Sequence, residues 1–254
     1  MAVVEVPIFP TIPDASIAVN FARLREKSGI LLDWFLCRTF SPWIGDLLAP
    51  GALIFDIGAH QGSKTSRFLS RGCKIVMVEP QSQMLKILKR KFRANNNVLI
   101  EPCAAGERSG QEEFFTAIDT PGISTLSRKW MNGRFRTTGR WNEGKKVRVK
   151  TIDELIHKYG KPDWVKIDVE GYEKKVLAGL SEKVGIISFE YSEENLVTAC
   201  QCVKKLQALG YRDFTFTDRG KDRFAGTWAS WPKILRMIKK NQKSGGAWGD
   251  IYGR

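Results

Sequence analysis

The stretch ALIFDIGAHQG, residues 52–62, is the starting point for reading the fold of this chain. Five apolar residues and one acid, Asp56, predict a buried strand that ends at a turn. Gly58 permits the tight turn, and Gly62 permits a close backbone approach where a helix begins. A strand, a glycine turn and a helix in this order are typical of the first unit of an α/β sheet.

Strands and helices continue to alternate after this unit. Apolar runs predict strands at 74–78, 97–103, 112–116, 146–150, 164–169, 184–189 and 211–217. Amphipathic segments predict helices at 63–70, 84–92, 151–159, 171–180 and 193–209. The alternation predicts an α/β fold with a mostly parallel sheet and helices on both faces. In such a sheet, ligands bind beyond the carboxyl ends of the strands.

We expect the 254 residues to form three regions. A helical extension at 1–48 precedes the core at 49–218, and a basic, aromatic tail follows at 219–254. Within the core, the basic segment 119–144 interrupts the alternation and is interpreted as a loop that could close as a lid. No apolar run is long enough to span a membrane and no secretory signal is visible, so we expect a cytoplasmic protein with reduced cysteines.

The chain is strongly basic, with a formal net charge of +14 and an isoelectric point near 9.7. Residues 128–150 alone hold nine basic side chains and a single acid, Glu143. This balance favours an anionic partner, although it also serves solubility. No sequence motif of a nucleic-acid-binding module accompanies it.

The turn at 58–62 and an acid after the next strand describe a nucleoside site. Glu79 lies 21 positions beyond Gly58, where a carboxylate can accept hydrogen bonds from both ribose hydroxyls. Asp56 would repel phosphate but could accept from an ammonium group, and the phosphate-binding glycine motifs are missing. A nucleoside that carries an amino acid is S-adenosylmethionine. The expected cofactor residues are Asp56, Gly58, His60, Gly62, Glu79, Pro80 and Ala104.

A second motif, VKIDVEGYE at residues 165–173, ends a buried strand with charged side chains. Charges in an apolar strand are costly unless they serve a site, and alternation directs Lys166, Asp168 and Glu170 to one side. We expect Asp168 near the reacting methyl group and Glu170 at the acceptor, and either carboxylate could be the general base. An ion pair at the strand end or an acid at a helix N-terminus would explain the same residues without catalysis.

Three further side chains are candidates for the site. Ser124 in the long loop and Glu190 after the strand at 184–189 are expected to contact the acceptor. His60 is another candidate base, although a surface or capping role explains it equally well. We assign no metal, because no ligand spacing requires one, although Asp168, Glu170 and Glu190 offer the oxygen ligands that Mg²⁺ prefers.

Several of these segments together resemble the FkbM family of methyltransferases. The matching segments are FDIGAHQG (55–62), VEP (78–80), ISTL (123–126), VKIDVEGYE (165–173) and VLAG (176–179). The resemblance extends over roughly residues 50–192. It implies a Rossmann-like class I methyltransferase fold, whose seven-stranded sheet has its last strand antiparallel. It also implies O-methylation, often of natural products or sugars, without fixing the acceptor.

The leading hypothesis is therefore an S-adenosylmethionine-dependent O-methyltransferase acting on a hydroxyl of a sugar, glycan or natural product. The net charge of +14 keeps an RNA ribose methyltransferase as an alternative, which salt-sensitive RNA affinity would reveal. A third alternative is a non-catalytic protein of the same fold that binds anionic partners through residues 128–150 and the tail. The acceptor, the methylated position and the oligomeric state do not follow from the sequence.

Overall fold

The computed structural model describes residues 44–64, 66–133, 136, 140–219, 221, 223–242 and 248–254. Most of the expected N-terminal extension and a few residues of the 119–144 loop lie outside this set. The first described element is the short helix η1 (Ile44–Leu47). Among the described residues, no helix has both the length and the apolar composition needed to cross a bilayer.

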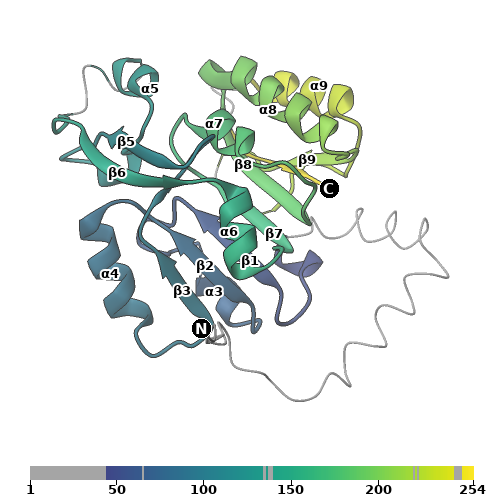
Figure 1. Ribbon diagram of the computed structural model, residues 1–254. Helices are drawn as coiled ribbons and strands as arrows, with labels where there is room; N and C mark the ends of the chain where they lie inside the picture. The colour runs from purple at the N-terminus through teal and green to yellow at the C-terminus, as the bar shows by residue number, and fades with distance from the viewer. Residues whose placement is uncertain are drawn as a thin grey trace.

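A seven-stranded sheet in the order β3-β2-β1-β7-β8-β10-β9 forms the centre of the fold (Figure 1). Its strands are β1 (Leu53–Ile57), β2 (Lys74–Val78), β3 (Val98–Glu101), β7 (Trp164–Ile167), β8 (Ile186–Ser192), β9 (Phe214–Phe216) and β10 (Trp248–Gly253). Only β10 runs antiparallel to its neighbours in this sheet. The strand order reverses between β1 and β7, which places a ligand crevice at their carboxyl ends. The predicted α/β fold with an antiparallel last strand is confirmed.

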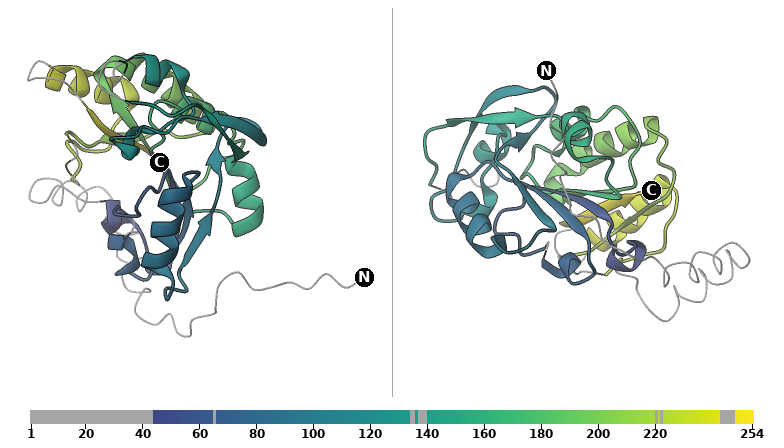
Figure 2. Two further views of the ribbon diagram at one scale, coloured as in Figure 1. Left: turned by 90° about the vertical axis from the view of Figure 1, so that its left-hand side faces the viewer. Right: turned by 60° about the horizontal axis from the view of Figure 1, so that its bottom comes forward.

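Alternate side chains of β1 and β2 enter two separate hydrophobic cores, one on each face of the sheet. Phe55 and Val76 belong to one core, whereas Ile54 and Ile75 belong to the other. The first core is covered by α6 (Ile152–Tyr159), α7 (Glu173–Ala178), α8 (Leu196–Ala208) and α9 (Trp231–Gln242). The second is covered by η1, α3 (Ser66–Leu69) and α4 (Ser82–Phe92), on the opposite face (Figure 2). Burial on both faces explains why these strands are apolar almost throughout.

A three-stranded sheet begins just beyond the carboxyl end of β3. It contains β4 (Ala104–Ala105), β6 (Lys145–Lys150) and β5 (Gly110–Phe114), and the segment between β5 and β6 includes η2 (Pro121–Ile123) and α5 (Arg128–Asn132). In Figure 1, β5, β6 and α5 lie together above α4. The segment after β5 therefore lies at the end of the large sheet where ligands are expected. Part of the expected loop, η2 and α5, therefore forms regular secondary structure.

The start of α6 shows how local sequence sets an element boundary. The Thr151 hydroxyl accepts the N–H of Glu154 at 3.1 Å, and the Glu154 carboxylate accepts the N–H of Thr151 at 3.0 Å. This reciprocal capping box satisfies two backbone donors that a helix start leaves unpaired. The helix predicted at 151–159 therefore begins at this cap.

The C-terminal region belongs to the fold, which corrects the expectation of a tail from residue 219. β10 lies between β8 and β9, with the Ile251 side chain fully buried, and α9 packs on the first core. A Cβ added to Gly249 would lie 2.2 Å from the carbonyl oxygen of Thr217, so glycine permits the close approach of this strand. The core therefore extends to Gly253, beyond the expected boundary at 218.

Candidate functional site

A cavity of about 480 Å³ opens at the carboxyl ends of β1, β2 and β7. Its walls include most of the residues that the sequence assigns to the site, namely Gly58, His60, Glu79, Pro80, Ala104, Ser124, Asp168 and Glu170. The motifs after β1, β2 and β7 therefore meet around one space, as the topology predicts.

The turn after β1 depends on Gly58. Its φ is +81°, and an added Cβ would lie 1.8 Å from the backbone oxygen of Asp168. The N–H groups of Gly58 and Ala59 both donate to the carbonyl of Val78, at 3.0 and 3.2 Å. Glycine at this position lets the turns after β1 and β7 touch, which brings the two motifs together.

Glu79 and His60 supply polar atoms to the cavity. The buried Glu79 carboxylate accepts the N–H groups of His60 and Gln81, each at 2.8 Å, and burial raises its pKa to about 7. Burial lowers the pKa of the His60 imidazole, although Asp168 opposes this effect. Its buried Nε2 atom has no hydrogen-bond partner among the described residues. The cavity therefore offers a carboxylate and a neutral ring nitrogen to a ligand.

Two predicted cofactor residues, Asp56 and Gly62, lie outside the cavity wall. Asp56 sits opposite Lys166 in the paired strands β1 and β7, and its carboxylate accepts from the Lys166 ammonium at 3.0 Å. A Cβ on Gly62 would lie 2.8 Å from the ring of Phe92 in α4. The expected ligand contacts are thus replaced by an internal ion pair and by helix packing.

Asp168 follows β7 and is held between two ammonium groups. Lys64 and Lys166 lie 3.1 and 3.2 Å from the same carboxylate oxygen. Burial by itself would raise the pKa of Asp168, but the two lysines hold it well below its usual range. The carboxylate therefore stays ionised at neutral pH.

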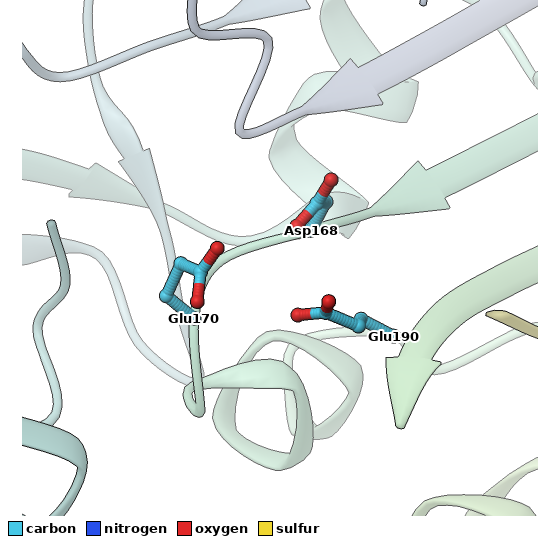
Figure 3. A group of neighbouring side chains, drawn as sticks. All are labelled: Asp168, Glu170 and Glu190. Carbon is cyan, nitrogen blue, oxygen red and sulfur yellow. The ribbon is translucent and has the colours of Figure 1, made fainter. Parts of the chain in front are cut away.

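Asp168, Glu170 and Glu190 bring their carboxylates together from the end of β7, the turn after it and β8 (Figure 3). One oxygen from each lies within 4.8 Å of the others. Burial, followed by the charge of Asp168, raises the pKa of Glu170 to about 8 and that of Glu190 to about 10. The group therefore holds protons at neutral pH, although Asp168 is ionised. The predicted convergence of these three residues is found in the structure.

Carboxylate oxygens at this spacing are ligands that Mg²⁺ accepts. Here the nearest cations are ammonium groups of the chain, because Lys64 and Lys166 both contact Asp168. These lysines supply the positive charge that an ion would bring. We assign no metal to the group.

Two charged residues near the site were not given roles from the sequence. Glu173 is buried and accepts the N–H groups of Gly171 at 3.1 Å and Val169 at 3.4 Å, which fixes the turn that carries Glu170. Glu173 is the last residue of the VKIDVEGYE motif, and this position is the sequence feature that could have indicated its role at the site. Lys64 is 104 positions from its partner Asp168, and no local pattern indicates that contact.

The Ser124 hydroxyl stabilises the loop to which it belongs. Although Ser124 lines the cavity, its hydroxyl accepts the N–H of Ala117 at 3.1 Å and donates to the carbonyl of Pro121 at 2.7 Å. Both interactions hold the segment after β5 in place. The hydroxyl is therefore occupied within its own loop, and its contacts do not support the expectation that Ser124 binds the acceptor.

A second cavity, of about 290 Å³, adjoins the acidic group through Glu190. Trp130 of α5 and Thr198 of α8 contribute to its walls, together with Ser192 at the end of β8. The buried Ser192 hydroxyl has no hydrogen-bond partner within the described part of the chain. This small space therefore has the polar side chains of Glu190 and Ser192 in its wall.

The comparison with protein-family models gives a match over more than half of the chain. A family model described as the methyltransferase FkbM domain matches residues 56–212. No curated protein sequence matches the chain.

Several solved structures are similar to the chain at low sequence identity. Fibrillarin from Aeropyrum pernix with bound S-adenosyl-L-methionine is 11% identical, with a TM-score of 0.43 over 88% of this chain and 74% of that one. A TehB-like SAM-dependent methyltransferase from Corynebacterium glutamicum is 9% identical, with a TM-score of 0.41 over 85% and 100%. Magnesium protoporphyrin IX methyltransferase from Synechocystis is 10% identical, with a TM-score of 0.42 over 97% and 88%. At these values the similarities carry no conclusion about substrate.

Proposed function

The chain belongs to the FkbM family of S-adenosylmethionine-dependent methyltransferases, and on this premise we propose that it methylates a hydroxyl oxygen of a sugar, glycan or natural product. The observation that carries the proposal is the convergence of Asp168, Glu170 and Glu190 beside the larger cavity. A hydroxyl group must lose its proton when its oxygen accepts a methyl group. A positioned carboxylate can take that proton as a general base.

The polar groups in the wall of the larger cavity suit the cofactor of the family. The buried Nε2 of His60 has no partner among the described residues, and the Glu79 carboxylate lines the same wall. We assign Glu79 to the ribose hydroxyls, because an acid at the end of the second strand takes that role in related nucleotide folds. When bound, S-adenosylmethionine supplies a methyl group activated by its sulfonium charge.

In this proposal each of the three carboxyl groups has a different role in methyl transfer. Asp168 is held ionised by Lys64 and Lys166, so it fixes the charge and position of the group. Glu170 lines the larger cavity and has a pKa raised by burial to about 8, which suits a general base near neutral pH. Glu190, with a pKa raised to about 10, keeps its proton and can donate a hydrogen bond to the acceptor.

Methyl transfer to a panel of acceptors tests the proposal. The panel contains sugars, nucleosides, RNA and natural-product alcohols, with isotopically labelled S-adenosylmethionine as the donor. We expect label on an oxygen of a non-RNA acceptor, identified by mass spectrometry of the product. Label on carbon or nitrogen, or on RNA alone, would contradict the proposal.

Asp168→Asn provides the matched test of the site. This variant should lose turnover but keep its circular dichroism spectrum and its affinity for S-adenosylmethionine. Asp213→Asn removes an exposed carboxylate whose ion-pair partner is Arg254, 4.0 Å away, and should leave turnover unchanged. Full activity of Asp168→Asn would remove Asp168 from the mechanism.

A further inference from the structure

An open groove of about 1110 Å³ lies between α5, α7 and β5. Of the residues that the structure describes, four cationic side chains line it against two acids: Arg128, Lys129, Lys174 and Lys175 against Glu112 and Glu113. The acids are already engaged, since Glu112 accepts from the Tyr172 hydroxyl at 2.5 Å and Glu113 pairs with Arg128. The groove therefore presents a surplus of positive charge.

Lys129 and Lys174 contribute the positive charge of the groove that no acid among the described residues neutralises. Both are exposed, and neither has an ion-pair partner among the residues that the structure describes. Lys175, in contrast, pairs with Glu107. Two available ammonium groups face the same groove from α5 and α7.

The groove shares wall residues with both cavities of the site. Gly171 and Thr198 line the groove and the cavity beside Glu190, whereas Leu126 and Tyr172 line the groove and the larger cavity. The groove therefore adjoins the two cavities whose walls contain Asp168, Glu170 and Glu190.

We propose that the acceptor carries a phosphate or diphosphate ester, bound by Lys129 and Lys174 while its hydroxyl lies at the carboxylates. This inference rests on the proposed function, because it names the class of acceptor for the same site. A phosphate monoester carries a charge of about −1.5 to −2 near pH 7, which two ammonium groups match better than they match a single carboxylate, and lysine binds phosphate as a compact point charge. Among the described residues, Arg128 is the arginine that lines the groove; it is occupied by Glu113 and lies over the Phe115 ring at 4.7 Å. The groove is thus suited to phosphate more than to a carboxylate.

Binding of inorganic pyrophosphate and of inorganic phosphate, measured by calorimetry on the full chain, tests this inference. The three proteins compared are the wild type, the double variant K129A/K174A and the matched control K86A/K89A. Lys86 and Lys89 are exposed residues of α4 outside the groove, so the control loses the same charge. We expect pyrophosphate to bind the wild type and the control, with at least tenfold weaker binding to K129A/K174A. Added salt should weaken the binding, because exposed charges are screened.

Equal pyrophosphate affinity in all three proteins, or no binding to the wild type, would overturn the inference. Binding of phosphate as tight as that of pyrophosphate would identify a monoester as the better acceptor, and tighter pyrophosphate binding would identify a diphosphate ester. S-adenosylmethionine affinity, measured in the same proteins, should not change. A wild type that binds pyrophosphate but transfers no methyl group would contradict the proposed function while leaving the groove assignment standing.

Discussion

Among single residues, Glu79 gives the most direct test of the cofactor site. Glutamine keeps the size of the side chain but removes the charge that strengthens hydrogen bonds from ribose hydroxyls. We expect Glu79→Gln to raise the dissociation constant of S-adenosylmethionine about 10–100-fold, measured by calorimetry. Glu182→Gln, at an exposed carboxylate paired with Lys161, is the control. An unchanged constant would contradict the placement of the ribose.

The same residue predicts how cofactor affinity depends on pH. Burial raises the pKa of Glu79 to about 7, and the ionised form is the better acceptor of hydrogen bonds. Affinity should therefore increase as the pH rises through about 7 and decrease as the carboxylate is protonated below it. Glu79→Gln should show no such step. A step of equal size in the variant would assign the titration to another group.

Glu170 is the residue at which the proposed proton transfer is tested. A base must be deprotonated to act, and burial raises the pKa of Glu170 in the free protein to about 8, so kcat/KM should rise with pH through about 8. Glu170→Gln should lower kcat about 10²–10⁴-fold and remove that rise, with cofactor affinity retained. Steady-state kinetics across pH 6–10 provides the measurement, and a variant with wild-type kcat would exclude Glu170 as the base.

At the level of elements, the turn between β1 and α3 depends on a close backbone contact. Gly58 and Gly51 have nearly the same φ, +81° and +79°, but only a Cβ on Gly58 would collide with the backbone of Asp168. Gly51→Ala should lower the free energy of unfolding by about 1–2 kcal/mol, the cost of a left-handed residue. Gly58→Ala should lower it by more than about 3 kcal/mol, because the collision is added. Urea denaturation compares them, and equal losses would show that the contact contributes nothing.

The elements that the sequence predicts well are those whose pattern is local. β2 has the predicted bounds, Lys74–Val78, because both of its faces are buried and its apolar run is continuous. Glu79 and Asp168 were placed at the site by topology, since parallel strands end at a common edge. The pairing of Asp56 with Lys166 depends on the register of strands that are 110 positions apart, and no local pattern contains it.

At the level of the whole molecule, β10 shows where local sequence is insufficient. Its residues, WGDIYG at 248–253, include two glycines and an acid, so their pattern does not predict a buried strand. The strand forms because β8 and β9 leave a gap that an antiparallel segment fills, with Ile251 paired to Phe189 and Phe216. The strand β10 can therefore be predicted only when the positions of β8 and β9 in the sheet are known.

A chain that ends at residue 247 tests whether β10 completes the core. Its loss would leave the facing edges of β8 and β9 unpaired and expose the core that Ile251 fills, so we expect no cooperative thermal transition by circular dichroism. Ile251→Ala should lower the free energy of unfolding by about 2–5 kcal/mol, because a fully buried side chain leaves a cavity. Trp248→Ala, at a side chain 45% exposed in the same strand, should cost less than about 1 kcal/mol. A shortened chain that unfolds cooperatively and still binds S-adenosylmethionine would show that the sheet is stable without its seventh strand.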